Sequence, residues 1–428
     1  MNTGRQLELW LGRQRIGRLD EQGSVWAFEY DRAWQVEGFD LSPQLPRQES
    51  PHVDGASDRP VQWFFDNLLP EDAARDVLAA ELSLASADAF GLLTALGAES
   101  AGAWTLRPPG AEGPESGLVP LPFAVLSRRI AAMPRFSLQH DAPKRMSLAG
   151  AQHKLAIVVD GDSWFEPRGD SASTHILKPD HPQVEHWPHS AFNESLCMRL
   201  AEAAGLNAPA TSFHRVPQPV YLVQRFDRRR GADGQVERLP VIDACQLLGV
   251  DRSYKYRLST PETLREVAAR CAKPAATRLA LLRWTIFNLL IGNGDAHLKN
   301  LSFLIGTAGV ELAPFYDLLS TAIYRQHPSF DRPNWAAAEV SLPHGELRRF
   351  GDLNRERLTE LARALAIAPA AAQRESGRMI ERLRMAFLQL EAQWQAAPMD
   401  RAPDGGEWRL FRSLGAGLFT EQARRLAR

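Results

Sequence analysis

One apolar segment, residues 279–291, limits the folds open to this chain more than any other feature. It is interrupted by Arg283 and Asn288, but a helix built from it is apolar on most of its sides. The segment is too short to cross a bilayer, so a protein core is its expected environment. A polar sequence, residues 292–300, follows at once. The chain therefore predicts a buried helix that ends in a polar loop.

The first of three expected parts, residues 1–115, begins with a small β-structure. Leucines alternate along residues 7–11 and Gly12 can start a turn, which predicts a hairpin at the edge of a small sheet. A helix is expected to begin at residues 70–72, where proline precedes two acidic residues. Residues 107–122 contain five prolines and three glycines, which predicts a loop or linker.

The second part, residues 116–228, mixes strands with one helix, and the third, residues 229–428, is mostly helical. The helix of the second part is expected to take Ser190 as its N-cap and to stop at Gly205. The other expected strands and helices are 155–159, 174–177, 221–223, 264–271, 278–291, 355–366 and 377–397. The chain is thus expected to form an α+β fold with two lobes, and a cleft between lobes is a common ligand site.

Composition narrows the class of protein. A formal net charge of −1 gives no support for general binding of polyanions. Cys197, Cys245 and Cys271 are far apart in the sequence, which argues against a CxxC metal site and a disulfide scaffold and favours a reducing compartment. The first residues contain no long apolar stretch of the kind found in secretory signals. We expect a cytoplasmic enzyme or regulator without a membrane span.

The loop after the buried helix carries the residues with the strongest chemical signal. Asp295 and Asn300 lie five positions apart in it. Beyond them, residues 301–305 and 310–314 can form a hairpin. A register that pairs 305 with 310 and 303 with 312 brings Asn300 close to Asp317. Two carboxylates and an amide are therefore expected to converge.

Such a group suits phosphoryl transfer. One carboxylate can orient the attacking hydroxyl, while an amide and a second carboxylate hold Mg²⁺ on the phosphates of ATP. Protein kinases separate the base from the metal-binding Asn by five positions, as Asp295 and Asn300 are separated. The alternative is that both are ordinary turn residues, because Gly, Asn and Asp dominate turns. Asp317 and two upstream features favour the kinase interpretation.

The upstream features are a lysine and a loop of small residues. Lys178 ends a short expected strand, where its ammonium can reach ATP phosphates, and Glu194 on the next helix can pair with it. Taken alone, a lysine at a strand end is more often an edge-strand feature that limits aggregation. Residues 147–152 allow backbone N–H groups to approach a phosphate, although an ordinary turn is the simpler interpretation of that loop alone.

These motifs occur in the order seen in HipA-like serine/threonine protein kinases, and the chain resembles that family over nearly its whole length. Two N-terminal blocks also look like the amino-terminal domain of the family. The matching blocks are 64–70, 97–104, 147–154, 174–179, 225–228, 292–300 and 314–317. The resemblance implies a kinase-like fold related to lipid kinases, with an added N-terminal subdomain.

The resemblance also implies roles for individual residues. Asp295 would accept a proton, Asn300 and Asp317 would bind Mg²⁺, and Lys178 would contact the ATP phosphates, supported by Glu194. The other implied nucleotide-binding residues are Ala149, Gly150, Ala151, Gln152, His153 and Lys154 in a phosphate-covering loop, Gln224, Arg225 and Phe226 at the adenine hinge, and His297, Lys299 and Tyr316 beside the nucleotide.

Four positions need separate comment. Family members often carry Glu where Gln224 stands, a change that matters little if the hinge uses backbone contacts. They also carry an acidic residue where His153 stands, so the chemistry of the loop tip differs here. Ser147 matches a serine that HipA-like kinases phosphorylate on themselves. For His297, a role in bracing the catalytic loop is an equal alternative to direct catalysis.

The function implied by the resemblance is that of a Mg-ATP-dependent serine/threonine kinase toxin that inhibits translation and growth. Family substrates include aminoacyl-tRNA synthetases, and the partner is a small helix-turn-helix antitoxin of HipB type, through which DNA would be contacted indirectly. Two alternatives are a small-molecule or lipid kinase and a catalytically silent co-repressor of the antitoxin. Arginines near the C-terminus are more simply explained by a solvated helix face than by DNA contact.

Overall fold

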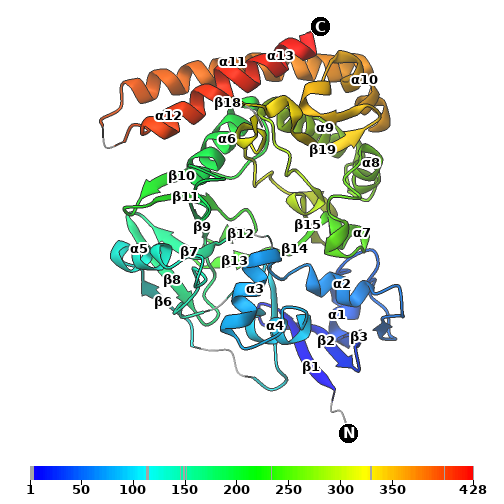
Figure 1. Cartoon of the computed structure of the whole chain (residues 1–428). Coiled ribbons are helices and arrows are strands. Elements are labelled where there is room, and N and C mark those ends of the chain that lie inside the picture. The colour runs from blue at the N-terminus through cyan, green and yellow to red at the C-terminus, as the bar shows by residue number, and fades with distance from the viewer. Residues whose placement is uncertain are drawn as a thin grey trace.

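The structure of the chain, a computed structural model, describes residues 4–111, 115–144, 146–147, 150, 152–232, 234–327, 330–399 and 401–427. In Figure 1 the N-terminal region (blue) lies at the bottom, a six-stranded sheet lies at the left, and the long helix α11 (Pro369–Gln395) crosses the top. The divisions expected near residues 115 and 228 stay a proposal about domain boundaries.

The N-terminal region is built on an antiparallel five-stranded sheet of order β4-β3-β2-β1-β5. The predicted hairpin is present, with Leu11 opposite Gln14. Its predicted edge position is wrong, because β5 arrives from a distant part of the chain and pairs with β1. The elements are β1 (Arg5–Leu11), β2 (Gln14–Gln22), β3 (Val25–Tyr30), β4 (His52–Val53), β5 (Trp104–Arg107), α1 (Arg32–Glu37), α2 (Pro60–Asp66), α3 (Asp72–Glu81) and α4 (Ala89–Leu96).

The second region is an antiparallel six-stranded sheet of order β10-β11-β9-β7-β8-β6. The expectation of a loop at 107–122 is wrong at its end, because residues 117–120 form an edge strand on β8. Pro120 ends this strand at the sheet edge, where a missing N–H interrupts no ladder. The strands are β6 (Gly117–Pro120), β7 (Leu155–Asp160), β8 (Ser163–Arg168), β9 (His175–Pro179), β10 (Thr211–Arg215) and β11 (Pro219–Gln224), and helix α5 (Phe123–Ala131) precedes β7.

Helix α6 (Ser190–Ala204) packs against β10 and β11 and links this sheet to the helical region. Its N-cap is His189 rather than the predicted Ser190. The Ser190 hydroxyl instead accepts a hydrogen bond from the backbone N–H of His181. Gly205 ends the helix in the left-handed conformation at φ 85°, as predicted.

The third region is mostly helical and surrounds α9 (Pro274–Ile291), whose last turns are buried on every side. A small antiparallel sheet has the order β14-β15-β16, and the polar loop connects the end of α9 to β15. Helix α11 begins eight residues before the expected start at 377. The other elements are β12 (Arg228–Arg230), β13 (Val236–Arg238), β14 (Val241–Asp243), α7 (Ala244–Leu248), α8 (Pro261–Ala269), β15 (Ser302–Gly306), β16 (Gly309–Leu312), β17 (Gln326–His327), β18 (Phe330–Pro333), β19 (Glu339–His344), β20 (Leu347–Arg349), α10 (Arg355–Ala364), α12 (Gly405–Arg412) and α13 (Thr420–Ala427).

Two further observations concern the class of protein. Within the described residues, no helix combines the length and the apolar character needed to cross a membrane. The three cysteines are buried free thiols on three different segments, so none of them pairs with another.

Candidate active site

A hairpin brings the predicted metal-binding residues together. Strands β15 and β16 pair in the predicted register, with Phe303 opposite Leu312. Near the open end, the side-chain amide of Asn300 donates to Asp317 Oδ2 at 2.8 Å. Asp317 has a left-handed backbone at φ 59°, which is uncommon for a residue other than glycine. Such a conformation costs energy and persists only where the surrounding structure holds the residue in place.

Lys178 links the carboxylates of Glu194 and Asp317. From β9, its ammonium donates to Glu194 Oε1 on α6 at 2.7 Å and to Asp317 Oδ1 at 2.6 Å. Burial alone would lower the pKa of Lys178, but these carboxylates raise it above its ordinary value. The predicted pair of strand lysine and helix glutamate is therefore present, and Lys178 joins both to the hairpin.

Oxygen atoms at this end of the hairpin suit a hard divalent cation. Asn300 Oδ1 is buried and accepts no hydrogen bond from the described part of the chain. Burial alone would raise the pKa of Asp317, but Lys178 and Lys154 hold it below its ordinary value, so the carboxylate is ionised. Amide and carboxylate oxygens are ligands that Mg²⁺ accepts. Asn300 and Asp317 thus fit the predicted metal.

Asp295 lies in the loop between α9 and β15, and its side chain is half-exposed. Its backbone N–H donates to Asn293 Oδ1 at 3.0 Å, and its Oδ1 accepts a hydrogen bond from the Tyr256 hydroxyl. Burial of the carboxyl raises the pKa of Asp295 to about 6. His297 Nε2 lies 4.0 Å from the same oxygen, and burial lowers the pKa of His297 to about 4, so that imidazole is neutral.

The predicted phosphate loop lies against the N-terminal region. Ala149 and Ala151 fall outside the described residues. Gly150 accepts a hydrogen bond from the backbone N–H of Glu71, and its φ of 105° favours glycine. A side chain at 150 would meet Lys154 Nζ at 2.8 Å, so glycine lets this ammonium approach the loop backbone. Burial, together with Lys178, lowers the pKa of Lys154 to about 8.

The remaining loop residues differ in accessibility. Gln152 and His153 are half-buried, and burial lowers the pKa of His153. Ser147 is fully buried, with its hydroxyl donating to the carbonyl of Leu68 at 2.5 Å and its N–H donating to the carbonyl of Glu99 at 2.7 Å. The predicted modification site is therefore enclosed in this conformation.

The predicted hinge is divided between two environments. The rings of Phe226 and Tyr316 lie 5.5 Å apart at 32°, which makes an aromatic pair beside the hairpin. The side chain of Gln224 is exposed. The side chain of Arg225 turns away from that pair into a buried ion cluster. The backbone N–H of Arg225 donates to the carbonyl of Thr174. Arg225 is thus a structural residue here, and only its carbonyl can serve a hinge.

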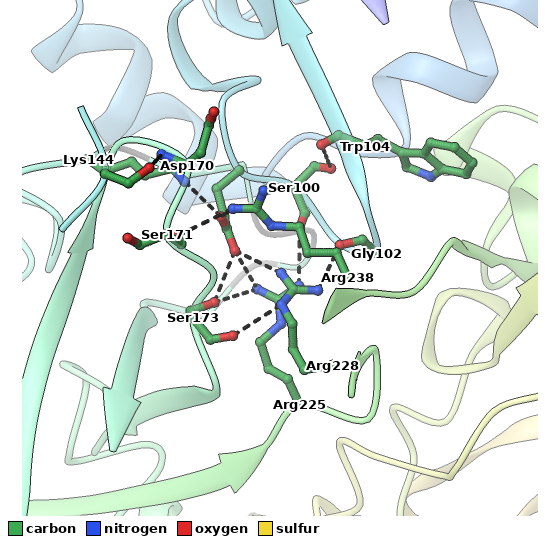
Figure 2. Close-up of polar contacts among 12 residues, drawn as sticks. Ser100, Gly102, Trp104, Lys144, Asp170, Ser171, Ser173, Arg225, Arg228 and Arg238 are labelled. Carbon is green, nitrogen blue, oxygen red and sulfur yellow. Dashed lines mark hydrogen bonds and ion pairs between the residues drawn. The ribbon is translucent and has the colours of Figure 1, made fainter. Parts of the chain in front are cut away.

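This ion cluster, the Glu99 cluster, consists of Glu99 and the four cations around it. Figure 2 shows Arg225 and Arg228 from one stretch of the chain converging with Lys144 and Arg238 from two others. Glu99 accepts from Lys144 at 2.8 Å, from Arg228 at 2.7 Å and from Arg238 at 2.5 Å. Because Glu99 comes from the N-terminal region, the cluster ties that region to β12, β13 and the segment before Ser147.

Lys299 was predicted beside the nucleotide, but its ammonium points to the N-terminal region. It donates to Asp243 at 2.6 Å and to the backbone and side-chain oxygens of Asn67 at 2.9 Å each. Glu71 Oε1 lies 3.4 Å away. These contacts occupy the ammonium of Lys299, and its predicted nucleotide contact stays a prediction.

Sequence reasoning missed residues that border Asp295. Lys255 donates to Glu71, and Tyr256 donates to Asp295. Both belong to a charged and aromatic loop after α7 that has no recognisable motif. The sequence indicates Glu71 only as a favourable acidic residue at a helix start, and the tertiary structure shows that it faces buried Lys299 and half-buried Lys255.

Comparisons with known proteins agree with this geometry. Residues 146–389 match the HipA-like C-terminal domain, and residues 7–107 match the HipA N-terminal domain. The serine/threonine-protein kinase toxin HipA of Shewanella oneidensis is 34% identical over 74% of this chain and 76% of its own. A putative kinase of Sinorhizobium fredii, Y4mE, is 39% identical over 75% of this chain and 79% of its own.

A solved structure supports the same assignment. The Shewanella oneidensis structure of HipA and HipB with their operator DNA matches with a TM-score of 0.82 and 28% identity, covering 98% of this chain and 97% of that one. The predicted α+β, kinase-like fold with an N-terminal subdomain is confirmed. The chain belongs to the HipA family of serine/threonine-protein kinase toxins.

Proposed function

We propose that this kinase transfers the γ-phosphoryl group of Mg-ATP to a serine or threonine of a protein, with Asp295 as proton acceptor. The observation that carries the proposal is the contact of Asn300, Asp317 and Lys178 at one end of the hairpin. Asp295 precedes Asn300 in the same loop by the spacing that kinases use.

Each residue has a distinct task. Lys178 neutralises phosphate oxygens and is kept in place by Glu194. Asn300 and Asp317 would hold Mg²⁺, which supplies positive charge to the phosphates when bound. The acceptor oxygen bonds to the γ-phosphorus, the bond from that phosphorus to the β–γ bridging oxygen breaks, and ADP leaves. Asp295 takes the hydroxyl proton.

We also propose that Ser147 is a self-phosphorylation switch. Its hydroxyl lies against the carbonyl of Leu68, so a phosphate of −1.5 to −2 charges does not fit where the hydroxyl now sits. Phosphorylation should therefore favour a conformation in which the loop has left the N-terminal region. Because Gly150 and Lys154 belong to that loop, ATP affinity and transfer should fall together.

Mass spectrometry tests the switch. After incubation with Mg-ATP, phosphate should appear on Ser147 in the active protein and not in Asp295→Asn, and calorimetry should show weaker ATP binding by the modified fraction. An unmodified Ser147 in protein that phosphorylates other substrates would remove the switch and leave the kinase proposal intact.

The proposed partner is a small helix-turn-helix antitoxin of HipB type, through which the chain would reach DNA. The support is the Shewanella oneidensis complex, which holds HipA, HipB and operator DNA and matches this chain over 98% of its length. The proposed protein substrate follows family precedent, an aminoacyl-tRNA synthetase, whose phosphorylation would inhibit translation and growth. With such a substrate, the proposed place of action is the cytoplasm.

Labelled ATP provides the direct test. Wild-type protein, incubated with [γ-³²P]ATP, Mg²⁺ and a bacterial lysate, should label discrete proteins at serine or threonine, as phosphosite mapping would show. Asp295→Asn should bind ATP normally and lose transfer by roughly 10² or more, the scale of a general base. Asp162→Asn, an exposed turn residue, is the matched control. Equal labelling by wild type and Asp295→Asn would reject the assigned role.

A further inference from the structure

A tyrosine outside every recognised motif contacts the proposed proton acceptor. We propose that Tyr256 is a positioning residue for the transfer reaction: its hydroxyl fixes Oδ1 of Asp295 so that the other carboxylate oxygen faces the acceptor hydroxyl. The inference rests on the proposed role of Asp295 and adds to it a residue that sets the orientation of the carboxylate.

Two contacts define the position of Tyr256. Its hydroxyl donates to Asp295 Oδ1 at 2.5 Å, and its ring meets that of His297 edge to face, with centroids 4.8 Å apart at 85°. The backbone of Asp295 is held separately, through its N–H and Asn293 Oδ1. The side chain of Asp295 is 43% exposed, so one side of the carboxylate stays open while the contacts fall on Oδ1.

The segment that carries Tyr256 is held from both sides. Arg252 pairs with Asp66 at 3.0 Å and Lys255 pairs with Glu71 at 2.5 Å, which fixes the segment to the N-terminal region. On the other side, the carbonyl of Lys255 accepts a hydrogen bond from the N–H of Leu298 in the catalytic loop. The position of the tyrosine hydroxyl therefore depends on how the N-terminal region and the catalytic loop lie relative to each other.

The expected effect follows from the strength of the contact. Hydrogen bonds to charged groups contribute enough to change a rate by roughly 10- to 100-fold when they hold a reacting group in place. Removing the hydroxyl frees rotation of the carboxylate and removes a donor that favours its ionised form. Transfer should therefore slow, and its acid limb should move to higher pH. The other ionisable groups that act on this carboxyl are Asp317, Lys255, Glu71 and His297.

Tyr256→Phe is the test, and Tyr254→Phe is its matched control. Tyr254 lies two positions earlier in the same segment, is 38% exposed against 49% for Tyr256, and contacts Arg257. Initial rates of ³²P transfer from ATP into the proteins of a heat-treated bacterial lysate would be measured for both variants, for wild type and for Asp295→Asn. Tyr256→Phe should lower kcat roughly 10- to 100-fold with KM for ATP and the melting temperature unchanged, while Tyr254→Phe matches wild type.

The outcomes separate this inference from the proposed function. Loss of transfer in Asp295→Asn with a wild-type rate in Tyr256→Phe would overturn the positioning role alone. Retained transfer in Asp295→Asn would overturn the proposed function. A second measurement needs no acceptor: the ¹³C signal of the Asp295 carboxyl, identified by its loss in Asp295→Asn, should titrate at higher pH in Tyr256→Phe than in wild type and in Tyr254→Phe. An unchanged titration would also overturn the inference.

Discussion

Glu99→Gln should lower the melting temperature of the chain by several degrees. The substitution keeps the shape of the side chain and removes the charge that faces Lys144, Arg228 and Arg238 at 2.5–2.8 Å. Arg225 lies 3.5 Å away and keeps Asp227 as a partner. The variant therefore leaves buried cations with too little negative charge.

The magnitude can be worked from these contacts. Breaking a buried ion pair by removing one partner costs about 3–5 kcal/mol, because the remaining charge is uncompensated. At about 2.1 cal/mol/K per residue, the unfolding entropy of 428 residues is about 0.9 kcal/mol/K if the chain unfolds as one unit. The melting temperature should therefore fall by about 3–6 °C.

Differential scanning calorimetry at pH 7 measures this shift, and Glu237→Gln is the matched control. Glu237 pairs with Arg229 on the surface of the neighbouring β12–β13 hairpin, where an ion pair contributes about 0–1 kcal/mol, so its shift should stay near 1 °C or below. Equal shifts in the two variants, or no shift in Glu99→Gln, would refute the reasoning.

The same variant has a pH signature. Burial alone would raise the pKa of Glu99, but Arg238 and Lys144 hold it well below its ordinary value of 4.5. The stabilisation is therefore complete above the unfolded value near 4.5 and is lost as the pH falls through the folded value. The difference in stability between wild type and Glu99→Gln should be constant near neutral pH and shrink in acid.

Three more outcomes test the catalytic assignments. Transfer should fall about tenfold per pH unit below about 6, where the Asp295 carboxyl takes up a proton, and a flat profile of kcat between pH 5 and 8 would contradict its role. Asp317→Asn should remove the extra thermal shift that ATP gives with Mg²⁺ over ATP alone, because the metal loses its carboxylate ligand. Lys178→Met should lower transfer by roughly 10² or more and also lower the melting temperature, because Glu194 and Asp317 lose their shared cation; a wild-type rate of transfer or a wild-type melting temperature would contradict this.

The hairpin of β15 and β16 could be predicted because the residues that determine it are close together in the sequence. The strands on either side of residues 307–308 are close in sequence, so one register follows from the turn and the alternation of side chains. That register alone predicts Asn300 near Asp317. The burial of helix α9 could be predicted in the same way, since residues 279–291 are apolar on most sides of a helix.

Elements whose partners are distant in sequence could not be predicted in the same way. Strand β5 pairs with β1 although nearly the whole N-terminal region separates them, so the hairpin was expected at an edge. Strand β6 looked like a linker because prolines and glycines dominate its surroundings. An edge strand tolerates that composition, and only the presence of β8 decides the outcome.

The direction of a charged side chain is equally hard to predict from the sequence. A motif identified Arg225 and Lys299 as part of the kinase region, but each also has a partner far away in the sequence, Glu99 for Arg225 and Asn67 for Lys299. Arg225 turns to Asp227 and the Glu99 cluster, and Lys299 turns to Asn67. A long flexible side chain can face either side of a strand or loop, so its direction depends on which region supplies the opposite charge.

That dependence brings residues of the N-terminal region into contact with the proposed catalytic centre. Glu71 pairs with Lys255 and lies beside Lys299, on the two segments that flank Asp295. Burial alone would raise its pKa, but Lys299 and Lys255 lower it to about 2, so it is charged at neutral pH. Glu71→Gln should therefore weaken both segments at once and lower stability and transfer together, whereas Asp76→Asn, an exposed residue of α3, should change neither. Calorimetry and transfer rates measured on the same samples would detect this coupling, and a loss of stability with unchanged transfer would show that the N-terminal region supports the fold alone.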